Sequence, residues 1–382
     1  MRASRCSPPL GAAWMATSCP LSYRLGAAAL RRAPTFRAPT VLYAVGGLYG
    51  NLEALAAIRA RAATEPCGEA VIVFNGDFNF FNAEPRWWSE LNAQIRRDHV
   101  ATAGNVEIES SAVEPSGLGC GCGYPAYVSP GVSERSDRIV ESLRSTAARA
   151  DAPELLDWLR SLPRALVAEV GASRRRVGIV HGDVDSLAGW QLGVEAMDPA
   201  DNALRASLGC DGTGMGGAEH LLPTTPQSKV VSWCEDADVA GLLCTHTCLP
   251  FGQLLLGASS GREQSGPPQS PQPPNQSQQY ALGVFNNGSG GMPNFAASRF
   301  GLATRVSDDP TPPADSLYGG VAGGLRYDAI PIRYDHAAWL ERFGAVWPEG
   351  SDAHTSYFAR LQHGPTGFKL RHAARAGTDG TC

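Results

Sequence analysis

Four polar residues follow directly after apolar runs, and this repeated arrangement restricts the possible folds more than any other feature. The run from Val71 to Asn75 leads through one glycine to Asp77, and three later runs lead to Asn105, His181 and His246. A short apolar run that stops at glycine and a polar residue is typical of a buried strand that opens into a loop. The functional groups of α/β folds gather at the carboxyl ends of such strands. We therefore expect these four side chains to meet.

The donor atoms of these four side chains suit a metal ion. One carboxylate, one amide oxygen and two imidazoles match a borderline divalent ion such as Zn, Mn or Fe. The sequence therefore predicts a divalent metal cofactor bound by Asp77, Asn105, His181 and His246.

Five short strings occur in a fixed order along the chain. They read Gly47-Leu-Tyr49, Gly76-Asp77-Phe-Asn-Phe80, Gly104-Asn105-Val106-Glu107, Val180-His181 and Thr245-His246-Thr-Cys248. In order and spacing they resemble the Asp-x-His, Gly-Asp-x-x-Asp, Gly-Asn-His-Glu, strand-end His and Gly-His-x-His elements of the calcineurin-like metallophosphoesterases. A further family element, Asn-x-Gly-Ser, corresponds to Asn286-Asn-Gly288-Ser289, and the resemblance extends over roughly residues 41 to 300.

The resemblance implies both a fold and a reaction. The fold is an α/β sandwich of four layers, in which two packed mixed β-sheets are flanked by helices. The reaction is hydrolysis of a phosphate ester or a phosphoanhydride, with a phosphorylated small molecule or protein as the substrate. The matching positions assign catalysis to the four metal-binding residues, and substrate binding to Asn105, Asn286, Gly288 and Ser289.

Three positions depart from the family pattern, and all three belong to one half of the metal site. The family holds one ion with the Asp and His of its first motif and the last His of its final motif, and here those positions are Gly47, Tyr49 and Cys248. The ligands of the other ion are kept, so the resemblance implies about one ion per chain, where an intact site holds two. Cys248 and Tyr49 are candidate ligands, since a thiolate or phenolate can bind zinc or iron. The alternative is that Cys248 only fills space as a small apolar residue.

One further departure affects catalysis itself. The family's His in Gly-Asn-His-Glu helps to protonate the leaving group, and this position is Val106 here. Loss of a general acid typically costs ~100-fold to ~10,000-fold in rate. Two alternatives to a hydrolase therefore stay open. One is a pseudoenzyme that binds a phosphorylated ligand without turnover, and the other is a thiol-assisted metal or redox protein that uses Cys248 with Cys120 and Cys122.

Composition bears on partners and on location. The net charge of −5 gives no electrostatic footprint for nucleic acid. No apolar run approaches the roughly 18 residues that a membrane span needs. The first 40 residues hold six Arg and no Asp or Glu, a composition typical of a chloroplast or mitochondrial transit peptide. A secretory signal and a disordered extension of a cytoplasmic protein are the alternatives.

The expected organisation is a leader (1–40), a metallophosphoesterase-like domain (41–361) and a C-terminal tail (362–382). Flexible insertions are expected at 207–218, which is rich in glycine, and at 259–279, which has no apolar residue except proline. Caps and periodicity predict helices at 51–63, 85–97, 133–150 and 153–161, and two more within 337–361. Strands are expected at 41–45, 71–75, 164–170, 175–180, 252–256, 280–285 and 326–334. The strands at 164–170 and 175–180 should form a hairpin.

Overall fold

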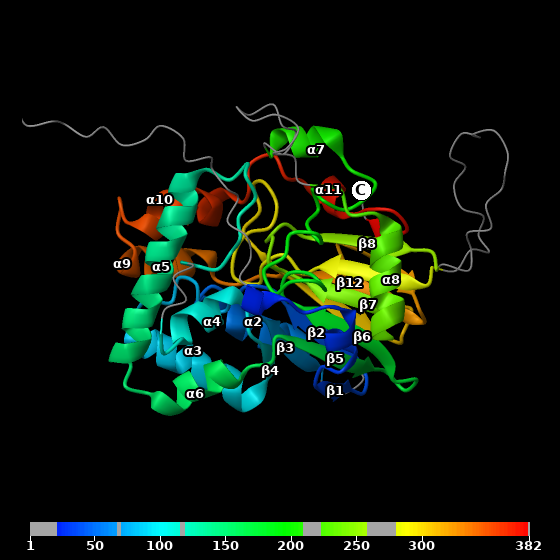
Figure 1. The fold of residues 1–382 in the computed structure, drawn as a ribbon, viewed down its shortest axis with the longest axis horizontal. Helices are drawn as coiled ribbons and strands as arrows, with labels where there is room; N and C mark the ends of the chain where they lie inside the picture. Colours follow the sequence, from blue (N-terminus) through cyan, green and yellow to red (C-terminus); the bar gives the residue numbers. More distant parts are fainter. Residues whose placement is uncertain (1–20, 67–69, 115–118, 209–222, 258–279, 381–382) are drawn as a thin grey trace, which may run out of the picture.

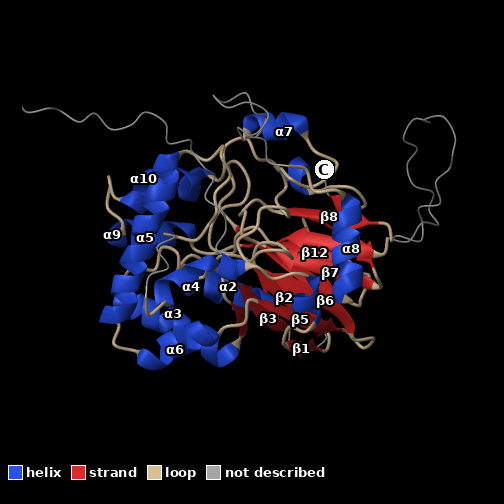
Figure 2. Cartoon of the chain, in the orientation of Figure 1, coloured by secondary structure: helices blue, strands red, loops and turns tan. Residues whose placement is uncertain are grey.

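The computed structural model describes residues 21–66, 70–114, 119–208, 223–257 and 280–380. Within them the chain forms two β-sheets that lie face to face, with helices outside (Figures 1 and 2). The expected α/β fold with two mixed sheets flanked by helices is therefore confirmed. The glycine-rich insertion and the Ser-, Gln- and Pro-rich insertion fall almost entirely outside the described residues.

One sheet has seven strands. Their order across the sheet is β13 (Asp379–Gly380), β11 (Tyr318–Ala322), β12 (Leu325–Ile332), β10 (Gly301–Ser307), β2 (Val41–Val45), β3 (Val71–Asn75) and β4 (Val100–Thr102). The last three strands are parallel to one another, whereas every other neighbouring pair is antiparallel. Because β2, β3 and β4 run in one direction, the loops that follow them meet at one edge of the sheet.

The other sheet has six strands. Their order is β1 (Thr35–Ala38), β5 (Ala165–Val170), β6 (Arg175–Val180), β7 (Gly241–Cys244), β9 (Leu282–Asn286) and β8 (Phe251–Leu255). Strands β5 and β6 form the expected antiparallel hairpin. Strands β6, β7 and β9 are parallel, so their carboxyl ends also meet at one edge.

The helices cover the outer faces of the two sheets. They are α1 (Ala27–Arg31), α2 (Leu52–Ala62), α3 (Pro85–Asp98), α4 (Asn105–Ser111), α5 (Pro130–Arg149), α6 (Pro153–Ser161), α7 (Asn202–Ser207), α8 (Gln227–Ala237), α9 (His336–Val346), α10 (Asp352–His363) and α11 (Leu370–Ala373). In Figure 1, α3, α5, α6, α9 and α10 form a helical half beside the strands, while α8 lies against the six-stranded sheet. Asn51 caps α2 as expected, because its side chain accepts a hydrogen bond from the Ala54 amide at 2.8 Å.

Two apolar cores follow from the alternation of side chains along the strands. In β2, Leu42 and Ala44 point into the core between the sheets, whereas Val41, Tyr43 and Val45 point into the core beneath the helices. All five residues are buried, so the strand reads as a continuous apolar run and not as an alternating one. A strand covered on both faces fixes the position of the loop that follows it.

Segments on both sides of residues 41 and 361 take part in the fold. Strand β1 pairs in parallel with β5, and Leu30 of α1 is buried in the apolar cluster that includes α8 and the six-stranded sheet. At the other end, Phe368 is buried and β13 pairs with β11. The domain boundaries at residues 41 and 361 stay a prediction, and segments on both sides of them add strands to the sheets and side chains to the core. A targeting role for the leader stays a prediction, and residues 1–20 lie outside the described structure.

Among the described residues, no helix is both long and apolar enough to cross a membrane.

Candidate metal centre

The predicted ligands come together at the edge where the parallel strands of both sheets end. Asp77 follows β3 and Asn105 follows β4, while His181 follows β6 and His246 follows β7. All four side chains are buried, with between 0% and 7% of their surface exposed. The two sheets thus each contribute two ligands to one position, which the strand-end pattern predicted.

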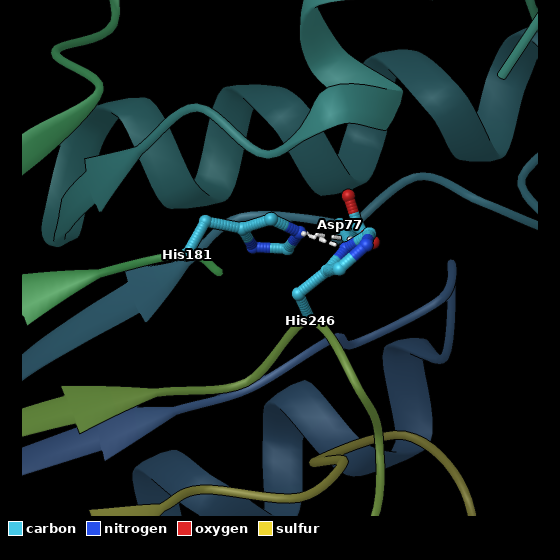
Figure 3. A group of neighbouring side chains, drawn as sticks. All are labelled: Asp77, His181 and His246. Carbon is cyan, nitrogen blue, oxygen red and sulfur yellow. Dashed lines mark hydrogen bonds and ion pairs between the residues drawn. The ribbon is translucent and has the colours of Figure 1, made fainter. Parts of the chain in front are cut away.

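Three of these side chains form a compact group of metal-binding type. The donor atoms of Asp77, His181 and His246 all lie within 4.8 Å of one another, and the side chains point toward a common centre (Figure 3). The Nε2 atom of His181 lies 3.3 Å from Oδ2 of Asp77 and 3.2 Å from Nδ1 of His246. Such spacing lets a single ion contact all three residues.

Asn105 joins this group through its side-chain oxygen. Its Oδ1 lies 3.2 Å from Nε2 of His181, while its Nδ2 donates to the carbonyl of Cys120 at 2.8 Å. The bond to Cys120 fixes the orientation of the amide, so its oxygen faces the other ligands. Asn105 also begins α4, which places it rigidly after its strand.

Backbone carbonyls set the orientation of both histidines. Nδ1 of His181 lies 2.8 Å from the carbonyl of Asn75, and Nε2 of His246 lies 3.3 Å from the carbonyl of Cys122. Each of these nitrogens donates to its carbonyl, so the opposite nitrogen of each ring, when the ring is neutral, offers a lone pair to the centre. A divalent ion at the centre would bind these nitrogens together with the Asp77 carboxylate. The residues present therefore fit a divalent metal ion.

In the absence of an ion, Asp77 and His181 form a buried charge pair. Burial raises the pKa of Asp77, but the charge of His181 and its hydrogen bond outweigh burial, and the net shift is downward. Burial disfavours the charged form of His181, yet the Asp77 carboxylate outweighs it and the pKa is raised. Burial and the charge of His181 lower the pKa of His246 to about 4. His246 is therefore a neutral imidazole near pH 7, the form that binds metals.

Two acidic residues near the candidate ligands, Glu107 and Asp183, hold loops in place through hydrogen bonds to backbone amides. Glu107 accepts hydrogen bonds from the backbone amides of Asp77 and Gly104 at 2.7 and 3.0 Å. Asp183 accepts bonds from the amides of its own loop, including that of Ser186 at 2.9 Å. Burial and the nearby charge of Asp77 raise the pKa of Glu107 to about 7. Both carboxylates hold the backbone in place and leave the four ligands to face the centre.

Protein side chains fill the space around Gly47, the region where the resemblance implies an altered half of the site, called the altered half below. A Cβ atom at Gly47 would lie only 2.3 Å from Cζ of Tyr49, so the tyrosine ring occupies the space that a side chain at position 47 would need. The Tyr49 hydroxyl lies 2.8 Å from Sγ of Cys248, and the two groups hydrogen bond to each other. Burial raises the pKa of both groups. Metal binding by Tyr49 or Cys248 stays a prediction.

The residues expected to bind substrate are engaged in loop contacts. Nδ2 of Asn286 donates to Oγ1 of Thr247 at 2.9 Å, and its Oδ1 accepts from the Gly288 amide at 2.9 Å. The Ser289 hydroxyl donates to the carbonyl of Gly47 at 3.0 Å. These bonds tie the loop after β9 to the loops after β2 and β7. A direct contact between these residues and substrate stays a prediction.

Sequence reasoning missed Trp190, which shapes the site, although it named the three cysteines nearby. The Trp190 ring packs edge-on against His246, with ring centroids 5.4 Å apart, and its Nε1 donates to the Cys122 carbonyl at 3.1 Å. The thiols of Cys120 and Cys122 lie 2.8 Å apart and contact each other, whereas Cys248 contacts Tyr49. No sequence signal pointed to Trp190, since it lies in an irregular loop between β6 and α7.

Comparisons with known proteins support the fold. No family model matches the sequence, and no curated protein matches it. A metallophosphoesterase from Sphaerobacter thermophilus is 15% identical, and the match covers 85% of this chain and 99% of that one with a TM-score of 0.46. A hypothetical protein from Pyrococcus horikoshii OT3 is also 15% identical, with 85% and 98% covered and a TM-score of 0.50. A serine/threonine phosphatase from Saccharomyces cerevisiae is 13% identical, with 81% and 90% covered and a TM-score of 0.32.

At such low identity the likeness concerns the fold alone. The expected resemblance to calcineurin-like metallophosphoesterases is thus confirmed as a resemblance of architecture. The described chain has two mixed β-sheets flanked by helices, and it carries a candidate metal-binding group of Asp77, His181 and His246 at the strand ends.

Proposed function

We propose that this protein hydrolyses a phosphate ester or phosphoanhydride with the help of about one divalent ion per chain, either Zn, Mn or Fe. One observation carries the proposal: buried donor atoms of Asp77, His181 and His246 converge within 4.8 Å at the meeting point of two parallel strand edges. Asn105 supplies the fourth ligand through its Oδ1. The substrate is a phosphorylated small molecule or protein.

The chain's own residues hold and orient the reacting groups. When bound there, a divalent ion would activate water and offset the charge of a phosphate group. The Val106 amide donates to Oδ1 of Asp77 at 3.2 Å, which helps to fix the carboxylate. The carbonyls of Asn75 and Cys122 keep the two imidazoles in the tautomers that leave a lone pair facing the centre.

The side chain of Val106 sets the range of substrates. It has no proton to give, so the departing group must leave without help from this position. Aryl phosphates and phosphoanhydrides, whose leaving groups are acidic, should therefore be cleaved far faster than simple alkyl phosphates.

The test is a series of phosphate esters that spans leaving-group pKa, assayed with the wild-type chain and with Val106→His. The wild type should show a steep dependence of rate on leaving-group pKa, and the variant should flatten it. His246→Ala should abolish turnover, whereas His363→Ala, which changes an exposed histidine on α10, should not. Turnover that survives in His246→Ala would refute the proposal.

A second candidate function is a pseudoenzyme that binds a phosphorylated ligand without turnover. The observation that favours it is the Tyr49 ring, which fills the space beside Gly47 where the second half of a two-metal site would need a ligand. Metal binding without hydrolysis of any ester in the series, by wild type or Val106→His, would establish this alternative.

A further inference from the structure

A guanidinium group lies beside the altered half of the site with no acidic partner. Nη2 of Arg360 on α10 donates to the carbonyl of Cys248 at 2.9 Å. Its Nε is buried and makes no hydrogen bond. Within the described ranges of the chain, no carboxylate lies within the 4.0 Å of an ion pair with Arg360. The group is partly buried, and a partly buried charge without an opposite charge is costly unless a ligand supplies one.

The surroundings of Arg360 connect it with the metal centre. The carbonyl that accepts the Arg360 hydrogen bond belongs to Cys248, two residues after the candidate ligand His246. Sγ of Cys248 lies 3.3 Å from the carbonyl of His246 and 2.8 Å from the Tyr49 hydroxyl. The guanidinium, the Tyr49–Cys248 pair and the His246 loop are therefore in direct contact with one another.

Helix α10 holds Arg360 in a defined place. Tyr357, one turn earlier, packs against Phe80 and Phe81 with ring centroids 5.5 and 5.1 Å apart. Phe81 in turn packs on Tyr49 at 5.6 Å. On its other side α10 lies along α5 (Figure 1), where Arg138 forms an ion pair with Asp352 at 2.6 Å. Ring contacts and an ion pair therefore hold α10 in place, and with it the backbone from which the Arg360 guanidinium projects.

We propose that Arg360, together with the Tyr49–Cys248 pair, forms an anion-binding position that receives a phosphoryl oxygen of the substrate. The proposal rests on the proposed function and specifies how its substrate is held. Tyr49 and Cys248 stand where the family has two histidine ligands of a second ion, so without that ion this half of the site would otherwise offer no positive charge to a phosphate. The planar guanidinium has free N–H donors in a fork that matches phosphate oxygens. Arg360 therefore supplies the second positive charge, while the four ligands supply the first through the ion.

The experiment measures binding of inorganic phosphate to the full-length chain by isothermal titration calorimetry, with the divalent metal content of each protein determined in parallel. The variants are Arg360→Met, Arg360→Lys and the control Arg138→Met. The control removes an ion pair between α5 and α10 at an exposed arginine, so it tests whether loss of any arginine contact of α10 affects phosphate binding.

Arg360→Met should keep its metal and lose about 10- to 100-fold in phosphate affinity, the range expected for a charge-assisted hydrogen bond. Arg360→Lys should recover part of the loss, since it restores the charge without the fork. Arg138→Met should bind phosphate like the wild type. Unchanged phosphate affinity in Arg360→Met would overturn the inference, and so would a loss of metal together with phosphate, because Arg360 would then only position the His246 loop.

These results separate the inference from the proposed function. If affinity for phosphate depends on Arg360 but no ester is hydrolysed, the anion-binding position stands and the hydrolase proposal fails. If esters are hydrolysed at equal KM by the wild type and by Arg360→Met, the hydrolase stands and the anion-binding position fails.

Discussion

Gly47 and Tyr49 should depend on each other in a way that stability measurements can detect. The structure places a Cβ at position 47 only 2.3 Å from Cζ and 2.5 Å from the hydroxyl oxygen of Tyr49. Carbon atoms in ordinary contact are about 3.5 to 4.0 Å apart, so Gly47→Ala forces the ring to move by more than about 1 Å. The ring cannot withdraw freely, because it packs against Phe80 and Phe81 with centroids 6.2 and 5.6 Å apart.

The expected cost follows from this overlap. Overpacking of a tight core costs about 1 to 3 kcal/mol, and replacement of glycine returns about 0.4 to 1 kcal/mol through the unfolded chain. Gly47 itself does not have a positive φ, so backbone strain adds nothing. Gly47→Ala should therefore lower the free energy of unfolding by roughly 0 to 2.6 kcal/mol in the wild-type background. In Tyr49→Ala, where the ring is gone, the same change should cost nothing or stabilise slightly.

The assay is urea unfolding of the two single variants, the double variant and the wild type. Together they give a coupling free energy of about 1 to 3 kcal/mol between positions 47 and 49. Additive effects, with the cost of Gly47→Ala unchanged in Tyr49→Ala, would refute the reasoning that the tyrosine ring fills this half of the site.

Three further predictions concern the N-terminal part of the described structure and the carboxylate of Glu107. A chain that begins at Thr40 should unfold at a lower temperature than one that begins at Leu21, because it lacks β1 and the buried side chain of Leu30. Leu30→Ala alone should cost about 2 to 5 kcal/mol in a full-length chain, and equal unfolding midpoints would contradict the packing of α1. Glu107→Ala should leave the amides of Asp77 and Gly104 without partners, at about 1 to 3 kcal/mol for each amide, and should also weaken metal binding. Unchanged metal content and unchanged stability in this variant would show that Glu107 does not hold the loop.

The sequence predicted the parallel strands and their polar ends well because both depend on local patterns. The runs before Asp77 and His181 are apolar on both faces, which is what a strand between two layers needs. Because each of these strands ends at the same edge of the molecule, the four candidate ligands lie close together, although two come from each sheet. The sequence predicted helix α2 equally well, because its cap and its apolar face lie within one short segment.

Other parts of the structure had no local signal. Strand β1 is short and half exposed, so its residues resemble a polar leader until the partner β5 is known. Trp190 and Arg360 reach the site through tertiary packing, and neither belongs to a motif. The Tyr49 ring lies where a Cβ at position 47 would be, and this placement depends on the left-handed backbone of Tyr49, whose φ is 57°. The residue type tyrosine does not predict such a φ.

The central claim is that four residues hold one divalent ion, and the most direct test is elemental analysis of the purified full-length chain after mild chelation. The account predicts about one ion per chain in the wild type and in Cys248→Ser, and loss of that ion in His246→Ala, which removes one of only four protein ligands. Two firmly held ions that persist in Cys248→Ser, or an ion that persists in His246→Ala, would contradict it.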